Sequence, residues 1–236
     1  IMTYMECPLR FKLSRIPHVP EPARTYFDVG SAVHAVAEHL TMKQKDGVQP
    51  TEELAFELLT KEWNSNAFQS ETEENQKKAE AKEMIRNYLH WLATNPNVPM
   101  DVEKDFRIEI AGVPYIGKID RVEQTPNGEL EVIDFKTGYA RENSKSVRED
   151  PQMNVYALAV QKLYGKLPKR ASLFYVKHDK LVPYEVSQSQ VDKVKEVLAE
   201  NTTAILQEKF EATPSYQTCR NCAYWDLCDF KETEES

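Results

Sequence analysis

The sequence predicts a mixed α/β fold, an α+β arrangement in which helices pack against a mixed sheet. Segments with helical periodicity and segments with strand-like alternation follow one another in the order helices, three strands, helix, two strands, helix. The chain has 236 residues, of which 41% are hydrophobic, so it is long enough to bury one sizeable core. No Gly/Ser-rich linker divides it, and we therefore expect one domain with a helical elaboration.

The first hundred residues are expected to be helical. Apolar residues recur there at steps of three and four, which is typical of helices that bury one face. The three expected helices are residues 28–45, 51–68 and 71–94. Pro96 and Pro99 then end helical structure, because proline lacks the backbone N–H that a helix needs.

Strands dominate the next part of the chain. The expected strands are residues 106–110, 115–123, 130–136, 173–177 and 181–186, with a helix at 151–164 between the third and fourth. Pro126-Asn127-Gly128 is a turn signal, and Ser187 with Gln190 forms a capping box for a last helix that reaches about residue 210. We expect a single domain over residues 1–236, with a helical part at 1–99, a core at 100–210 and a cysteine-rich tail at 211–236.

An acid and an amine stand two residues apart on the third strand. Because side chains alternate along a strand, Asp134 and Lys136 point to one face while Ile133 and Phe135 point to the other. Burying two charges without a role is costly. These residues alone are equally consistent with a buried ion pair, with a strand end at the surface or with a functional site.

The preceding strand adds a second carboxylate. If the hairpin loop is the three-residue turn with Gly128 left-handed, Thr125 faces Glu129 and Asp120 falls opposite Asp134. Directly opposed side chains have Cβ atoms about 4.5–5.5 Å apart. Two carboxylates at that distance repel each other unless a cation lies between them, and Mg²⁺ or Mn²⁺ suits oxygen ligands. A β-bulge would shift this register.

Four short motifs in this order resemble a known nuclease family. They are Gly30-x-x-x-His34, the Gly117–Arg121 strand, the Asp134–Gly138 strand and Gln152-x-x-x-Tyr156, whose spacing puts both side chains on one helix face. Together they resemble the RecB-like branch of the PD-(D/E)XK nucleases, and the resemblance spans nearly the whole chain. It implies a PD-(D/E)XK, restriction-endonuclease-like core and a metal-dependent DNA nuclease that hydrolyses phosphodiester bonds.

The resemblance implies a Mg²⁺ or Mn²⁺ site. Asp120 and Asp134 would ligate the metal, assisted by the backbone carbonyl of Phe135, and His34 would complete or flank the site. A lone histidine beside an apolar helix stripe is usually structural, but Gly30 before it and the downstream carboxylates favour a ligand here. The residues after His34 do not form the His-Glu-x-x-His arrangement, which argues against a metalloprotease.

The remaining motif residues would serve the reaction itself. Lys136 would position the attacking water and stabilise the developing charge, while Gln152 and Tyr156 would contact DNA or support the site. Glu38 and Glu103 are further acids that we expect around the centre.

All four cysteines lie near the two ends of the chain. They are Cys7 and the Cys-x₂-Cys-x₅-Cys set of Cys219, Cys222 and Cys228. Four thiolates complete one zinc or iron–sulfur site, and two disulfides are the other reading. The resemblance favours a 4Fe–4S cluster, because a subset of RecB-like nucleases, including AddB-type subunits and CRISPR adaptation nucleases, carries this cysteine pattern.

Composition restricts the function classes. The net charge of −8 is unlike that of most DNA-binding proteins, although a nuclease needs only a local basic groove. No stretch is apolar enough to span a membrane and no leader pattern opens the chain, so we expect a cytoplasmic, nucleoid-associated protein. No phosphate-binding loop of a motor is present, so the protein would either act alone or rely on a helicase partner or helicase domain for unwinding.

The favoured function is an exonuclease on single-stranded or end-processed DNA, in repair or recombination. A CRISPR adaptation nuclease that trims spacer precursors is an alternative within the same family. A non-catalytic DNA-binding iron–sulfur module and an electron-transfer protein are alternatives from other classes, and neither accounts for the paired acids and lysine.

Overall fold

A five-stranded mixed sheet is the centre of the fold. The computed structural model describes residues 2–17, 19–20, 25–140 and 143–233. The strands are β1 (Val98–Ile110), β2 (Val113–Gln124), β3 (Leu130–Lys136), β4 (Arg170–Tyr175) and β5 (Lys180–Glu185), and they lie side by side in that order. β3 and β4 run parallel, whereas β2 with β3 and β4 with β5 are antiparallel. The predicted mixed sheet is thereby confirmed.

The chain divides into two compact units. The larger comprises Arg24–Ile108 and Pro114–Val191, and the smaller comprises Ile1–Ala23, Glu109–Val113 and Asp192–Ser236. Across the part of the chain that the structure describes, no helix is both long and apolar enough to cross a membrane.

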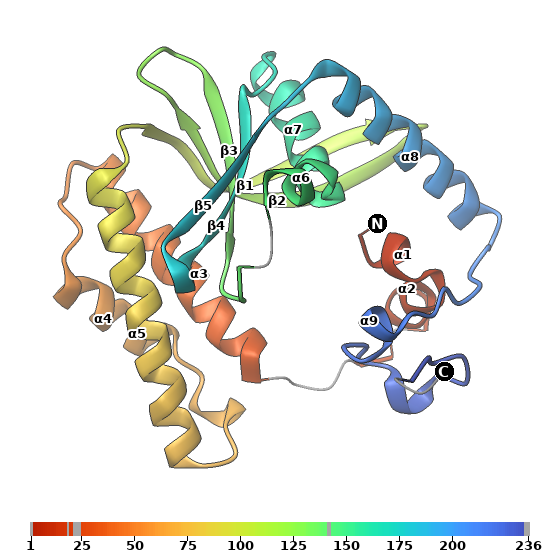
Figure 1. The fold of residues 1–236 in the computed structure, drawn as a ribbon, viewed down its shortest axis with the longest axis horizontal. Helices are drawn as coiled ribbons and strands as arrows, with labels where there is room; N and C mark the ends of the chain where they lie inside the picture. The colour runs from red at the N-terminus through yellow and green to blue at the C-terminus, as the bar shows by residue number, and fades with distance from the viewer. Residues whose placement is uncertain (1, 18, 21–24, 141–142, 234–236) are drawn as a thin grey trace. The chain divides into compact units, whose positions relative to one another are not determined.

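Helices pack on both faces of the sheet in the larger unit. The helices of this unit are α3 (Thr25–Lys45), α4 (Glu52–Glu62), η1 (Ser65–Ala67), α5 (Glu71–Thr94), α6 (Ser144–Glu149), α7 (Pro151–Tyr164) and η2 (Val176–His178). Figure 1 shows α3, α4 and α5 grouped on one side of the sheet and α7 on the other. Ile133, Phe135 and Phe174 join the core formed with α3 and α5, while α7 buries every residue from Met153 to Val160.

The smaller unit joins the two ends of the chain. Its helical elements are α1 (Met2–Glu6), α2 (Pro8–Arg15), α9 (Tyr216–Cys219) and η3 (Trp225–Leu227), and α8 (Gln188–Leu206) enters it from the larger unit. The rings of Tyr4, Phe11 and Phe210 pack together with centroids 5.6–6.4 Å apart. Tyr4 donates a hydrogen bond to the carbonyl of Lys209 at 2.7 Å, so residues distant in sequence hold this unit together.

Several predicted bounds differ from the observed ones. The second helix ends at Glu62 because Trp63 turns to an extended backbone and donates from its indole to Glu74. The first strand begins at Val98, well before the predicted start, and includes Pro99; proline is tolerated there because β1 lies at the sheet edge. The last helix ends at Leu206. The short helices α1, α2, α6 and α9 were not predicted at all.

Candidate functional site

The β2–β3 hairpin has the predicted register. Thr125 donates its backbone N–H to Glu129 at 2.8 Å, and Gly128 is left-handed with φ of 78°. The pairs then run from Gln124 with Leu130 to Arg121 with Ile133. Beyond the last pair the Asp120 carboxylate accepts the Phe135 backbone N–H at 2.7 Å. The turn therefore sets the register of the two strands, and the next pair in that register is Asp120 opposite Asp134.

The two aspartates share a face of the sheet. Arg121 and Ile133, which pair across the hairpin, both face α3 and α5. Since strand side chains alternate, their neighbours Asp120 and Asp134 face the other way. The predicted convergence of the two carboxylates on one face is confirmed.

These carboxylates line a large cleft. Its volume is about 890 Å³, and its walls come from α3, α5, β1, β2, β3, α7 and η2. The lining side chains that carry charge or chemistry are His34, Glu38, Lys77, Glu80, Glu103, Asp120, Asp134, Lys136, Tyr139, Gln152 and Lys177. The cleft thus contains every residue that the motifs assign to the reaction except Tyr156.

Three of these side chains are close enough together to hold one metal ion. A ligand atom from each of His34, Glu103 and Asp120 lies within 4.8 Å of the other two. His34 Nδ1 is 3.6 Å from the nearer Asp120 oxygen, and His34 also hydrogen-bonds to the backbone of Phe135. Nitrogen and carboxylate oxygens form a suitable donor set for Mn²⁺ or Mg²⁺.

The observed set differs in part from the expected ligands. His34 and Asp120 belong to it as expected, but its second carboxylate is Glu103, whereas Asp134 forms a 2.7 Å ion pair with Lys136. Glu103 adopts a left-handed φ of 45° within β1. Glu103 lies just before the predicted first strand, where the sequence indicates only a flanking acid, and nothing in the local sequence predicts a left-handed backbone at a glutamate.

Burial shifts the pKa values of both aspartates and of His34. The pKa of Asp120 is raised to about 8, first by burial and then by the charge of Asp134. Burial also raises the pKa of Asp134, although Lys136 opposes this. Burial lowers the pKa of His34, which favours the neutral imidazole that ligates metals. A divalent cation would relieve the repulsion between the acids, so the residues present fit a metal ion.

Lys136 is held by a chain of polar contacts. Its Nζ donates to Gln152 Oε1 at 3.0 Å, and Gln152 Nε2 donates to the Tyr156 hydroxyl at 2.8 Å. Burial lowers the pKa of Lys136, but the Asp134 carboxylate more than offsets this and the net shift is upward. The Lys136 ammonium is therefore charged, and Gln152 of α7 helps to hold it in the lining of the cleft. Asp150 caps that helix by accepting from the backbone N–H of Gln152.

Two motif glycines permit close packing. A Cβ on Gly117 would lie 2.5 Å from the ring of Phe106, and the Phe106 ring in turn packs edge-on against Tyr156 with centroids 6.1 Å apart. A Cβ on Gly30 would lie 3.3 Å from Thr137 Oγ1, in the segment after β3. Gly30 therefore lets α3 approach the strand end that carries Lys136.

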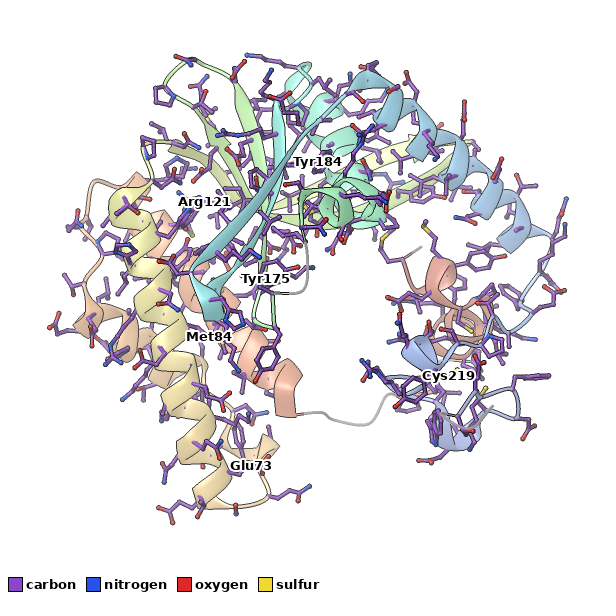
Figure 2. All side chains as sticks on the ribbon, viewed as in Figure 1. Glu73, Met84, Arg121, Tyr175, Tyr184 and Cys219 are labelled. Carbon is purple, nitrogen blue, oxygen red and sulfur yellow. The ribbon has the colours of Figure 1, made fainter. Side chains whose placement is uncertain are left out.

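The motif arginine is part of the core. Arg121 is 0% exposed, donates to Glu123 at 2.6 Å and to Thr41 Oγ1 at 2.8 Å, and lies 4.9 Å from the Trp91 ring centroid. Figure 2 labels it between the sheet and the helices that cover this face. Its contacts connect β2 to α3 and α5, which fixes the strand that carries Asp120.

A separate cavity in the smaller unit contains the cysteines. Cys7, Cys219, Cys222 and Cys228 are all free thiols and all line this cavity, and Cys219 is labelled in Figure 2. The pKa of Cys222 is raised by burial, with a further rise from the neighbouring Cys228 and Cys7. Residues from both ends of the chain thus line this cavity, and the predicted cluster site stays a prediction.

The chain is similar to several known proteins. The model of the PD-(D/E)XK nuclease superfamily matches residues 1–229. The Gene 69 proteins of Mycobacterium phages D29 and L5 are 28% and 25% identical, over 94% and 93% of this chain and 91% and 90% of their own lengths. The solved structure of a candidate exonuclease from Eubacterium rectale aligns with 96% of this chain and 82% of its own, with a TM-score of 0.53 and 16% identity.

Proposed function

The chain belongs to the PD-(D/E)XK nuclease superfamily, and from this premise we propose that it is a metal-dependent DNA nuclease. One observation carries the proposal: Asp120, Asp134 and Lys136 line the same cleft. Two buried acids beside a fixed ammonium match the needs of phosphodiester hydrolysis, which requires both a cation site and a group that stabilises anionic charge.

In this proposal the metal is Mg²⁺ or Mn²⁺, and this chain holds it with His34, Glu103 and Asp120. Asp134 and the backbone carbonyl of Phe135 would supply further oxygen ligands, as the family resemblance implies. When bound, the cation polarises the scissile phosphate and makes water more acidic. The raised pKa of Asp120 supports the assignment, because a buried carboxyl without a counter-charge is the state that cation binding corrects.

Lys136 is proposed to orient the attacking water and to neutralise the charge that develops on the phosphate. Gln152 restrains the Lys136 ammonium by accepting a hydrogen bond from it at 3.0 Å. Gln152 is fixed in turn by Tyr156, so these two residues act as positioning groups for the lysine.

Single substitutions test the proposal. Asp120→Ala, Asp134→Ala and Lys136→Ala should each abolish Mg²⁺- or Mn²⁺-dependent cleavage while the far-ultraviolet circular dichroism stays that of the wild type. Asp46→Asn, which changes an exposed acid beyond the end of α3, is the matched control and should cleave normally. Undiminished cleavage by the Asp134 variant would rule the assignment out.

We further propose that the enzyme belongs to the RecB-like branch and acts as an exonuclease in DNA repair or recombination, alone or beside a helicase. The Gly30, His34, Gln152 and Tyr156 motif positions support the branch, because Gly30, His34 and Gln152 line the cleft and Tyr156 contacts Gln152. End-labelled, end-blocked and circular DNA separate the modes of action. Cleavage that requires a free end supports an exonuclease, whereas cleavage of circles contradicts it.

The four cysteines are proposed to bind a 4Fe–4S cluster with a structural role. The proposal is supported by the position of the four thiols, which all line one cavity, and four thiolates are the ligand number of one such cluster.

Metal analysis of protein purified without oxygen tests the cluster. We expect iron and inorganic sulfide, lost together with stability in Cys222→Ser, and cleavage that falls only as far as the folded fraction does. Stoichiometric zinc in place of iron would contradict the proposal.

A further inference from the structure

An exposed aromatic residue lines the cleft of the proposed active site. Tyr139 lies three residues after Lys136, lines the cleft, and is 67% exposed. Most tyrosines bury the ring and leave only the hydroxyl in water. An aromatic ring in solvent beside a site that handles nucleic acid therefore needs an explanation.

Two basic residues accompany this tyrosine. Lys177 Nζ is 4.4 Å from the ring centroid of Tyr139, and both Lys177 and Lys77 line the cleft. Lys177 comes from η2, directly after β4, and Asn87 of α5 fixes η2 by donating to the Val176 carbonyl at 2.9 Å. The Lys177 ammonium thus comes from a fixed turn and lies next to the segment that follows β3.

Internal packing explains only part of this arrangement. Lys177 and Lys77 both contact Glu80, at 3.8 Å and 3.1 Å, which gives each lysine an internal partner. These contacts are long or partly exposed, and exposed pairs of this kind contribute little to stability. They do not account for Tyr139, whose ring is mostly in solvent although it also borders His178.

We propose that Tyr139 stacks against an unpaired base of single-stranded DNA while Lys177 and Lys77 contact its backbone phosphates. This inference rests on the proposed nuclease function and names the substrate class of the same cleft. Stacking on a protein ring requires a base whose face is free, which a single strand offers and the interior of a duplex does not. An aromatic ring beside lysines is the combination that single-strand-binding proteins use.

The position of Tyr139 relative to the reacting centre fits this role. Three residues of chain span at most about 10 Å, which is no more than about three nucleotides even at the compact rise of about 3.4 Å per nucleotide that a strand has in duplex DNA. A base held by Tyr139 would therefore lie within a few nucleotides of the phosphate beside Lys136. Stacking there would fix the strand while hydrolysis proceeds.

Binding to a non-cleaving protein tests the stacking directly. In an Asp134→Asn background with Ca²⁺, fluorescence anisotropy would measure the affinity for a single-stranded oligothymidine and for a blunt duplex of equal length. Tyr139→Ala should weaken single-strand binding about 5- to 150-fold, the range for loss of one stacked base. Tyr139→Phe should bind as the background protein does, and the duplex affinity should change by less than twofold in both variants.

Lys177 is tested by salt dependence. Lys177→Ala should lower the slope of log affinity against log salt by about 0.7 for single strands, and Lys177→Arg should restore it. A merely structural role predicts lower thermal stability with no change in either quantity. Equal weakening of duplex and single-strand binding, or unchanged single-strand binding by Tyr139→Ala, would overturn the inference.

The outcomes separate this inference from the proposed function. If the wild type cleaves DNA but Tyr139→Ala binds single strands normally, the stacking role is wrong and the nuclease assignment stands. If single-strand binding depends on Tyr139 but the wild type does not cleave with Mg²⁺ or Mn²⁺, the nuclease assignment is wrong and the binding role stands.

Discussion

Replacing the arginine beside Asp120 tests whether it is structural or catalytic. Arg121→Met keeps an unbranched, flexible side chain but removes a guanidinium that is 0% exposed and donates to Glu123 at 2.6 Å. Glu123 is itself fully buried, so it loses its only charged hydrogen-bond partner among the described contacts. Removing one partner of a buried pair costs about 3–5 kcal/mol. Asn95 still donates to Glu123 at 2.8 Å, so we expect a value near about 3 kcal/mol.

Urea denaturation at neutral pH measures this loss. For a chain of this size, about 3 kcal/mol corresponds to a fall in Tm of about 6–12 °C. Arg107→Met, which changes an exposed arginine on β1, is the control and should stay within about 0.5 kcal/mol of the wild type. Adding Glu123→Met to Arg121→Met should recover part of the loss, because it removes the uncompensated charge.

Two results would refute the structural assignment. One is a loss of stability no greater than that of the Arg107 control. The other is folded Arg121→Met protein that cleaves DNA as poorly as the Asp134 variant, because Arg121 faces α3 and α5 on the side of the sheet opposite Asp134.

Three further predictions concern the cleft and the strand that carries Asp120. Gln152→Ala should slow cleavage about 10- to 100-fold in kcat with little change in KM, because it frees Lys136; single-turnover kinetics at saturating DNA would show it. Gly117→Ala should lower stability by about 1–3 kcal/mol in urea, since the new methyl overlaps the Phe106 ring; a neutral result would mean that the ring moves freely. In metal-free protein the folded pKa of Asp120 is raised to about 8, so its contribution to stability is complete at low pH and is lost as pH rises toward 8. Denaturation between pH 5 and pH 9 should therefore show a decline that Asp120→Asn flattens, and an equal decline in that variant would contradict the assignment.

Local sequence signals predicted the parts of the fold that have strong periodicity and clear ends. β3 and α5 have the expected bounds, and Ser70 caps α5 by accepting from the Glu73 backbone N–H at 3.2 Å. α7 also begins and ends as expected, between Pro151 and the left-handed Gly165 that follows it. In each case the stop and start residues carry their own backbone preference, independent of the rest of the molecule.

The site was predictable as far as the hairpin controls it. The turn with Gly128 sets the register, and the register sets Asp120 beside Asp134. Glu103 was not predictable in the same way, because its left-handed backbone depends on tertiary contacts and not on its own preference. The partner of Lys136 on α7 depends likewise on how that helix docks on the sheet.

The short N-terminal helices could not be predicted from the local sequence, for a related reason. α1 has only five residues, too few to be stable alone, and the Tyr4 ring is buried against residues near the other end of the chain. Long-range contacts, among them those of Tyr4 with the Phe210 ring and with the Lys209 carbonyl, hold that segment in its structure.

A crystal structure of the wild-type protein soaked with Mn²⁺ tests the metal centre most directly. An anomalous difference map should show Mn²⁺ in the cleft, with His34 and the Asp120 carboxylate as ligands and Asp134 or Glu103 supplying further oxygen. Ligand oxygens should lie about 2.0–2.6 Å from the ion. The same soak of Asp120→Asn should show no such peak. Mn²⁺ bound away from Asp120, or an empty cleft in protein whose cleavage still requires Mn²⁺, would contradict the account.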